Sequence, residues 1–488
     1  MDSQIVLTIS FIVYTSAIIG VGLYSSRMRK RTEDDFTLAN RELGPWVSAL
    51  SASASAESGW VMLGLVGEAY LFGMSAFWIV PGIAAGYLFN WFVIAERLRR
   101  ESLRMGTSTL PQYLDARFGG GSVALKSIAI VIITAAMLGY VAAQMNAAGK
   151  AFDAVFHLPY WLGVLIGAVV ILVYTITGGF RAICWTDVIQ SSFMFVAMVG
   201  MPIILLARIG GWDMFMQGLQ SIDTHAGSSE AIMLSIAGGK TGMTAFGFVI
   251  GLLGIGLGYP GQPHILARFM AVRDEESVKR GGAIAISWMV IVYLGAVLFG
   301  LMAKVYFGIM DDPEQALPRA VSEFLPPVIG GFVIAAIVSA ICSTADSQLI
   351  VVSTAISRDV PAMLGKMGRS FKQIQFTDRV VLVVLALISV FFALTENRVI
   401  FSFVLYAWSA LGASFGPLVI LSLLWKGTTR AGAIAGMLTG IIVTIVWRNV
   451  PSLKAVVYEL VPAFVLAFLA VWLVSLMTSS GKVAERQE

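Results

Sequence analysis

Three residues near position 340 have the spacing of a cation site. Ala340, Ser343 and Thr344 stand at i, i+3 and i+4, so a helix would present one carbonyl and two hydroxyls on one face. Sodium is a hard cation and, by analogy with other hard cations, needs several converging oxygens. Main-chain carbonyls of Ala54 and Glu57 would complete such a shell if their helix is broken where it crosses this one. Alternatively, both hydroxyls bond back to their own helix.

Two carboxylates and one more hydroxyl predict a further polar site. Asp346 and Ser347 extend the same face by one turn, and Asp187 opens the sixth apolar run of the chain. Carboxylates inside a membrane are costly and indicate function. We expect these three residues to bind a second cation or a proton. The alternative for Asp187 is a charge at a helix N-terminus or a salt bridge to Arg181.

The composition places these residues in a membrane. Hydrophobic residues make up 58% of the 488 and charged residues 13%, and mean hydropathy is +0.83. A soluble domain carries about a quarter charged residues. The basic residues behind the net charge of +4 lie in short loops, where they set the membrane topology, so we expect no nucleic-acid partner. We also expect no enzymatic activity, because the sequence pairs no nucleophile with a base and has no metal cluster or phosphate loop.

About thirteen apolar runs are long enough to cross a bilayer, and lipid requires each of them to be helical. The sequence therefore predicts an all-α polytopic membrane protein. The runs lie near residues 5–24, 46–72, 77–95, 123–147, 160–178, 188–207, 242–262, 282–306, 328–352, 379–395, 399–424, 431–447 and 457–477.

Basic clusters predict the orientation. They follow the first, third, seventh and ninth runs and consist of Arg27, Arg29, Lys30, Arg31; Arg97, Arg99, Arg100, Arg104; Arg268, Arg273, Lys279, Arg280; and Arg358, Lys366, Arg369, Lys372. With the N-terminus outside, all four clusters fall on the cytoplasmic side, as the positive-inside rule requires. The tail 481–488 is then cytoplasmic too. We expect a multi-pass protein of the bacterial inner membrane.

Two of the runs carry residues that interrupt a helix. The second contains the small and polar stretch 51–59, and the seventh contains glycines and prolines over 251–263. Tight helix packing is the alternative explanation, since small residues also let membrane helices approach closely. The starts of the two interrupted helices are five spans apart. This spacing predicts two five-helix inverted repeats, each opening with a discontinuous helix beside a central binding site.

This organisation divides the chain into five segments. We expect a first helix and loop, a first repeat, an external loop that forms short helices or a lid, a second repeat, and two final helices with a short tail. Their bounds are 1–40, 41–208, 209–241, 242–425 and 426–488.

Three long motifs identify a resemblance. They are GGFRAICWTDVIQ at 178–190, GLGYPGQPHILARFMA at 256–271 and YAWSALGASFGPLVILSLLW at 406–425. The stretches RELGP at 41–45 and ALSA at 49–52 also match. Over about residues 5–475 the chain resembles the solute:sodium symporter family, most closely its bacterial sodium/proline symporters. The resemblance implies thirteen spans, ten of which form a LeuT-like core.

The resemblance also implies roles for single residues. It places sodium at the five residues named first, gives Asp187 a part in cation handling, and ties Arg41 to sodium coupling. Tyr140, Tyr259 and Pro263 match positions that shape the solute pocket, and Tyr259 also matches the inner gate. The expected solute-binding residues are Ser55, Ser58, Gly59, Tyr140, Gln144, Ile255, Tyr259, Gln262 and Pro263, and the expected coupling and gate residues are Arg41, Trp60 and Tyr259.

Six positions depart from the proline symporters, and two of them, Gln144 and Asn146, are bulkier and more polar than their counterparts. Those proteins carry aspartate at Ala56, methionine at Glu57, tryptophan at Ile255 and serine at Asp346. The departures leave the transporter class intact and put the solute in doubt.

The sequence therefore predicts a sodium-coupled symporter, functional as a monomer, that imports a small amino acid by alternating access, with proline first among the candidates. The open alternatives are another amino acid, a monocarboxylate or a sugar derivative. For a sugar, Gln144, Asn146, Glu57 and Glu68 are the candidate contacts. A transporter-like solute sensor is a further alternative from a different class of protein.

Overall fold

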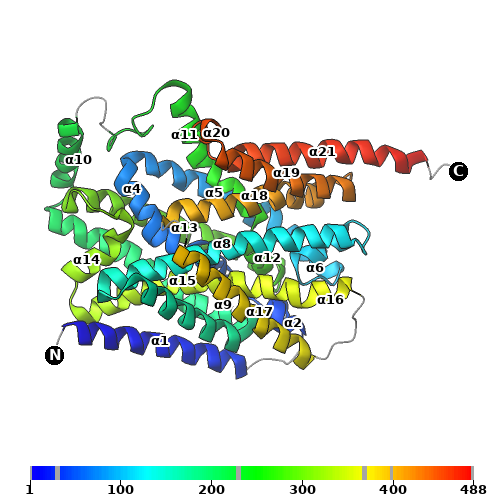
Figure 1. The fold of residues 1–488 in the computed structure, drawn as a ribbon, viewed down its shortest axis with the longest axis horizontal. Helices are drawn as coiled ribbons and strands as arrows, with labels where there is room; N and C mark the ends of the chain where they lie inside the picture. Colours follow the sequence, from blue (N-terminus) through cyan, green and yellow to red (C-terminus); the bar gives the residue numbers. More distant parts are fainter. Residues whose placement is uncertain (1–2, 28–32, 227–231, 365–370, 396–398, 485–488) are drawn as a thin grey trace.

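The computed structural model describes residues 3–27, 33–226, 232–364, 371–395 and 399–484. Within these ranges the chain is helical, and its one β-type pairing is an isolated bridge between Leu43 and Val272. The helices form an elongated bundle whose long members run roughly along the same axis (Figure 1). The prediction of an all-α architecture is confirmed.

The described part of the chain contains twenty-one α-helices, joined by short 3-10 and π-helical segments and loops. They are α1 (Ser3–Arg27), α2 (Glu33–Leu38), α3 (Pro45–Ala56), α4 (Val66–Phe72), α5 (Ile79–Phe89), α6 (Glu96–Arg104), α7 (Leu110–Arg117), α8 (Val123–Phe156), α9 (Tyr160–Ile209), α10 (Trp212–Ala226), α11 (Gly242–Gly254), α12 (Pro263–Met270), α13 (Glu275–Phe307), α14 (Ala316–Phe324), α15 (Pro327–Thr354), α16 (Val360–Met363), α17 (Phe371–Thr395), α18 (Ile400–Leu424), α19 (Arg430–Asn449), α20 (Pro451–Lys454) and α21 (Leu460–Ala484).

Eleven helices in the described residues are long and apolar enough to cross a membrane, so the predicted count of about thirteen is not confirmed. The run 46–72 is cut after Ala56, and its second half is counted with the next run as Trp60–Arg104. The run 160–178 contributes the shorter apolar helix Tyr160–Val173. Both differences arise where a helix is interrupted, which shortens the continuous apolar length.

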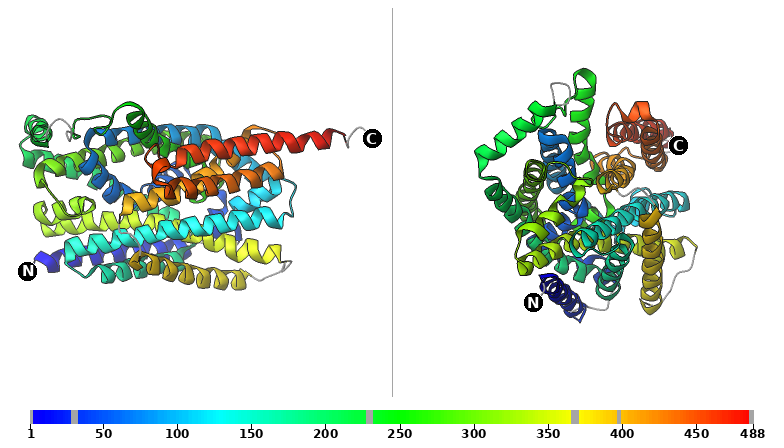
Figure 2. Two further views of the ribbon diagram at one scale, coloured as in Figure 1. Left: turned by 45° about the horizontal axis from the view of Figure 1, so that its top comes forward. Right: turned by 60° about the vertical axis from the view of Figure 1, so that its left-hand side comes forward.

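The two ends of the bundle differ in what they carry. α1 begins at the end opposite to the one where α21 finishes (Figure 2). α10 and α14 lie at the first end, and α6 and α16 lie at the second (Figure 1). Arg97, Arg99, Arg100 and Arg104 of one predicted basic cluster lie on α6, and Lys279 and Arg280 of another lie near the start of α13, where Glu275 pairs with Arg100. The predicted loop charges Arg29, Lys30, Arg31, Lys366 and Arg369, and the tail residues 485–488, lie outside the described residues.

Burial separates the central helices from the peripheral ones. In the most apolar 18-residue windows of α15 and α18, 83% of the residues are buried within the protein, against 33% for α1 and α21. A helix buried by its neighbours can hold polar side chains that lipid would exclude. The centre of the bundle, around α3 and α15, is therefore where the predicted site residues can reside.

Candidate functional site

The predicted interruption of the second apolar run is present. α3 begins with Pro45 in its first turn and ends at Ala56, and Glu57 has φ −94° and ψ 73°, outside the helical region. The chain becomes helical again at Trp60, in a π-helical segment that continues into α4. The residues of α3 from Ser48 to Ala56 are all buried. Alternating serine and alanine therefore give α3 a slim surface that lets neighbouring helices approach its end.

α15 crosses α3 just before the break. The Ser343 hydroxyl lies within donating distance of the carbonyl of Ala54, at 3.0 Å, and of Ala340 in its own helix, at 3.2 Å. The Thr344 hydroxyl is 3.3 Å from the Ala54 carbonyl and 3.1 Å from the Ser55 carbonyl. The contact with α3 and the back-bond to the helix thus both occur at Ser343. Five oxygens converge here, the donor set that a hard cation prefers.

Glu57 is placed differently from its neighbours. Its carboxylate accepts hydrogen bonds from the Tyr87 hydroxyl of α5, at 3.5 Å, and from the Trp288 indole N–H of α13, at 3.2 Å. The side chain therefore bonds to a different side of the break from the one that Ser343 and Thr344 occupy. Only the main-chain carbonyl of Glu57 is retained as a candidate cation ligand.

A buried guanidinium occupies the second predicted cation site. Arg268 of α12 is 0% exposed, and its Nη2 lies 3.2 Å from Asp187 Oδ2 and 2.5 Å from Ser347 Oγ. Its Nε lies 3.1 Å from Ser51 Oγ, which donates to the same Asp187 oxygen at 2.6 Å. The Phe180 ring covers it at 5.1 Å. One side chain thus joins α3, α9, α12 and α15.

This arrangement corrects three sequence-based interpretations. Arg268 was grouped with loop charges, but it lies inside the bundle because α12 continues past the glycine- and proline-rich stretch. Arg181 does not pair with Asp187; its ion pairs are with Asp35 and Glu42, both at 2.8 Å. Asp187 also lies within α9, beyond the interruption at Gly179, instead of opening a helix.

The Asp187 and Asp346 carboxylates are only partly satisfied. Asp346 Oδ1 accepts from the Ser347 hydroxyl at 3.3 Å, and Ser347 lies 3.0 Å from the hydroxyl of Ser55. Asp187 Oδ1 and Asp346 Oδ2 are buried and have no hydrogen-bond partner among the described residues. Two carboxylates face one guanidinium, which leaves capacity for one further cation or proton.

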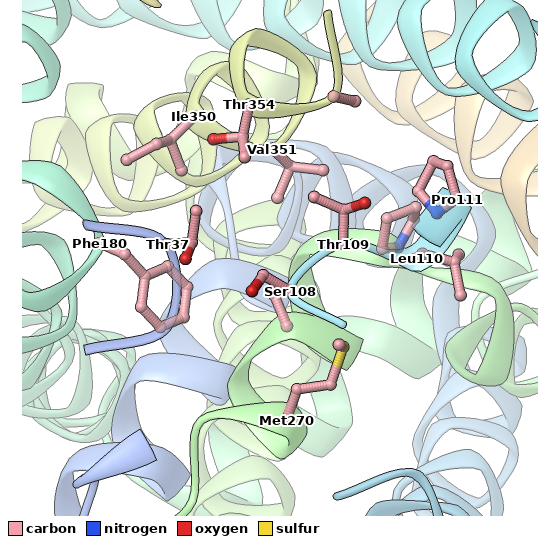
Figure 3. A pocket seen from close by; sticks show the side chains of 13 residues that line it. Thr37, Ser108, Thr109, Leu110, Pro111, Phe180, Met270, Ile350, Val351 and Thr354 are labelled. Carbon is pink, nitrogen blue, oxygen red and sulfur yellow. The ribbon is translucent and has the colours of Figure 1, made fainter. Parts of the chain in front are cut away.

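A cavity lies beside this cluster. Figure 3 shows Phe180 and Thr37 on one side of it, Met270 below, and Ile350, Val351 and Thr354 of α15 above. Pro263, one of the expected solute-binding residues, lines this cavity. Phe180 thus both lines the cavity and covers the Arg268 guanidinium.

At the second interrupted helix, side chains of the protein already donate hydrogen bonds to the freed carbonyls. Between α11 and α12, residues Ile255–Gly261 form a tight 3-10 segment and Gln262 is extended. The Trp408 indole donates to the Ile255 carbonyl at 3.0 Å, and the Asn90 amide donates to the Tyr259 carbonyl at 3.0 Å. The Gln262 amide donates to the Gly258 carbonyl at 3.2 Å. These carbonyls already have donors.

The expected solute-binding residues divide among several places. Gln144 accepts from the freed amide of Gly59 at 3.1 Å and donates to the Ser58 hydroxyl at 3.2 Å, so these three residues meet at the first break. Tyr140 lies one turn earlier on α8, and its buried hydroxyl has no hydrogen-bond partner among the described residues. Trp60 bridges the break through its indole, which donates to the Ala56 carbonyl at 3.0 Å.

The sequence analysis missed a group of aromatic residues around Glu57. Tyr87 packs against Tyr259 with ring centroids 4.8 Å apart, and the hydroxyls of Tyr259 and Tyr293 lie 3.3 Å apart. Trp60 packs against Tyr293 at 5.8 Å. Tyr87 and Tyr293 are buried tyrosines within apolar helices, which is the signal that could have singled them out.

Arg41 ties the two inner half-helices together. Its guanidinium donates to the carbonyls of Met270, at 2.9 Å, and Thr107, at 2.7 Å. Burial lowers the pKa of Arg41 from its ordinary value, and nearby Asp34 partly opposes this effect. Leu43 and Arg273 add two backbone bonds between the loop before α3 and the end of α12. The chain around Arg41 has positive φ at 56°, a costly conformation that these contacts hold in place.

Known proteins show the same architecture. A Na⁺-coupled sialic acid symporter, solved in a substrate-bound outward-open state, superposes with a TM-score of 0.78 over 97% of each chain at 18% identity. Mhp1, a nucleobase-cation-symport-1 family transporter, gives a TM-score of 0.54 at 14% identity over 91% of this chain and 95% of its own. These likenesses confirm the predicted fold class.

Sequence similarity is closer. The high-affinity proline transporter PutP of Bacillus subtilis is 36% identical over 93% of this chain and 95% of its own. The sodium/proline symporter of Salmonella typhimurium is 33% identical over 99% of this chain and 95% of its own. Residues 36–440 match the sodium:solute symporter family. Together with the broken helix and the oxygens that converge on it, these matches show that the chain belongs to the sodium:solute symporter family.

Proposed function

We propose that this protein imports a small amino acid, with proline first among the candidates, together with sodium and by alternating access. The observation that carries the proposal is the meeting of the Ser343 and Thr344 hydroxyls with the carbonyls at the end of α3. The names of the PutP and sodium/proline symporter relatives support proline as the cargo.

The proposed sodium ligands are the carbonyls of Ala54, Glu57 and Ala340 and the hydroxyls of Ser343 and Thr344. The hydroxyls bond to the Ala54 and Ser55 carbonyls in this structure, so a bound ion would take over both sets of oxygens. Sodium would hold α3 and α15 together at the break. This joint then orders the neighbouring turn of Ser58 and Gly59, where the solute is expected to bind.

The second charge site has its own role in the proposal. Asp187, Asp346 and Ser347 surround Arg268, and the excess of one carboxylate would be neutralised by a proton or a second cation. Arg268 thus supplies part of the positive charge that the sequence assigned to an ion. The Phe180 cavity beside it is the proposed route by which sodium leaves.

The proposed topology follows the arrangement of the ends. The end with α6 and α16 faces the cytoplasm of a bacterium and the end with α10 faces outward, which puts the N-terminus outside and the C-terminus inside. The repeats at 41–208 and 242–425 are the two halves that exchange access. We propose that the protein works as a monomer and has no enzymatic activity.

The sodium gradient supplies the driving force in this mechanism. One charge moving inward through 100 mV releases about 2.3 kcal/mol, before any concentration difference is added. The coupling between two sites in one protein is typically about 1–3 kcal/mol and is reciprocal. Sodium should therefore tighten solute binding by the same factor by which the solute tightens sodium binding.

Gating is assigned to the aromatic residues and the inner half-helices. α3 and α12 are joined by Arg41, by the Leu43 backbone bonds and by Arg268, so we propose that they move together when the cytoplasmic side opens. Trp60 and Tyr259 would then separate the solute from water on the two sides.

Uptake into membrane vesicles tests the proposal. Radiolabelled L-proline is offered with an inward gradient of sodium or of potassium at equal membrane potential. We expect accumulation with sodium and equilibration with potassium. Equal uptake in the two gradients would refute sodium coupling. Sodium-driven uptake of a different solute in place of proline would refute proline as the cargo and leave sodium coupling intact.

A further inference from the structure

Glu57 is a buried carboxylate without a compensating cation. Its side chain is 0% exposed, and none of the ion pairs in the described part of the chain includes it. Its partners are the neutral donors of Tyr87 and Trp288. Burying an unpaired carboxylate costs several kcal/mol unless it takes up a proton or meets a cation, so a cationic partner that binds during function would stabilise its charged form.

The surroundings of Glu57 suit an organic cation. Aromatic faces attract ammonium groups, and quaternary ammonium ligands are commonly bound in aromatic cages. The side chains of Tyr87, Tyr259, Tyr293 and Trp60 come from four different segments and contact one another in that order, and Tyr87 also donates to the Glu57 carboxylate. A small cavity between α3, α5 and α12 is lined by Tyr87 and Tyr259. Glu57 does not line this cavity, but its carboxylate lies against the aromatic side chains of Tyr87 and Trp288.

The opposite side of the break suits a carboxylate. The freed backbone amide of Gly59 starts the outer half-helix and donates to Gln144, and the Ser58 hydroxyl lies beside them. The positive end of a helix favours an anionic group, which would take over the Gly59 amide from Gln144. Within three residues of chain, the break thus offers a receptor for a positive group and a receptor for a negative one.

We propose that the Glu57 carboxylate and its aromatic cage bind the cationic nitrogen of the transported solute. The inference rests on the proposed transport function and narrows its cargo to zwitterions, either amino acids or betaines. It decides against monocarboxylates and neutral sugars, which cannot neutralise Glu57. It also assigns different ligands to two parts of Glu57. The main-chain carbonyl binds sodium, and the side-chain carboxylate binds the solute.

Thermal stabilisation of the purified protein tests the solute class. The probes are L-proline and glycine betaine, which carry a cationic nitrogen, and tetrahydrofuran-2-carboxylate and D-galactose, which do not. In sodium buffer we expect at least one of the first pair to raise the unfolding temperature and neither of the second pair to do so. Stabilisation by a nitrogen-free probe, or by none of the four, overturns the inference. Equal stabilisation in potassium defeats sodium coupling and leaves the inference standing.

The variant Glu57→Gln then tests the residue. It keeps the side-chain size and the main-chain carbonyl, so we expect the solute dissociation constant to rise about 30-fold or more while the sodium constant stays within twofold. Glu276→Gln, the same change at an exposed carboxylate, is the matched control and should alter neither constant. An unchanged solute constant, or a rise confined to the sodium constant, overturns the assignment. If Glu57→Gln does not fold, Glu57→Asp keeps the charge and should retain the preference for cationic nitrogen.

Discussion

The two interrupted helices look alike in the sequence and differ in how their backbone is satisfied. At the first break, the carbonyls at the end of α3 face the hydroxyls of Ser343 and Thr344, which a cation can replace as partners. At the second break, the carbonyls of Ile255 and Tyr259 receive N–H donors from Trp408 and Asn90. An ion cannot compete easily for a carbonyl that already has a fixed N–H donor.

The second break is also packed more closely against neighbouring helices than the first. A Cβ added at Gly256 would lie 1.9 Å from the Gly82 carbonyl oxygen, and one at Gly258 would lie 2.0 Å from the Trp408 indole nitrogen. The second break is thus pressed directly against α5 and α18. The first break is bordered by side chains: a Cβ added at Gly59 would lie 2.9 Å from Ala147 Cβ and 3.0 Å from the Ile341 side chain. Small residues and helix breakers in the sequence therefore indicate where a helix is interrupted. Whether the interruption forms an ion site or a rigid hinge depends on the groups that the neighbouring helix presents to it.

Removing the Arg268 guanidinium, which joins the helices at the two breaks, gives the largest expected effect. Arg268→Met removes the guanidinium that joins α12 to Asp187 of α9 and to Ser51 of α3. It leaves two buried carboxylates uncompensated, so we expect a loss of about 3–5 kcal/mol in stability and little folded protein. Thermal unfolding in detergent measures this loss.

A second substitution at the same cluster serves as the control. Arg268→Met combined with Asp187→Asn removes one of the carboxylates and should recover part of the lost unfolding temperature. If Arg268→Met alone is as stable as the wild type, Arg268 does not hold α3 and α12 together.

The close packing at the second break gives the next effect. Gly256→Ala forces a methyl group against the main chain of α5, and we expect a loss of about 1–3 kcal/mol in stability together with reduced transport. Gly200→Ala is the matched control, because a Cβ there meets nothing within 4 Å. If the two variants unfold at the same temperature, the second break is looser than the structure implies.

Much of the first break could be predicted from the sequence. A run of serine and alanine at 51–56 has few explanations inside an apolar span, and the spacing of Ala340, Ser343 and Thr344 is a property of a single helix. Local patterns of this kind survive folding because they depend on neighbours three or four residues away. The all-α fold followed from hydropathy for the same reason.

The rest depended on contacts between distant segments. Arg268 follows a glycine- and proline-rich stretch, so it resembled a loop charge, and only the packing of α12 against α9 and α15 reveals its partners. The direction of the Glu57 side chain depends on the backbone at the break, where ψ is 73°. That angle turns the carboxylate toward α5 and α13, which helical spacing cannot foresee.

The first break should also differ from the second in its response to sodium. Ser343→Ala removes a hydroxyl beside the Ala54 carbonyl, and we expect the sodium concentration for half-maximal uptake to rise about tenfold, or roughly 1.4 kcal/mol. Measuring proline uptake against sodium concentration checks this. Ser343→Thr keeps the hydroxyl and should rescue the constant more than Ser343→Ala does. An unaltered sodium constant in the alanine variant would place the ion elsewhere.

The smallest effect is expected from Trp408→Phe at the second break. The ring remains to pack against Tyr259, but the donor to the Ile255 carbonyl is lost, which costs about 1 kcal/mol of stability. Because that carbonyl holds no ion in the proposed mechanism, the sodium constant should stay within about twofold of wild type, near the resolution of such measurements. A clear fall in sodium affinity would show that the second break also contributes to the ion site. The two interruptions would then be alike in function, and the difference in their donors would lose its significance.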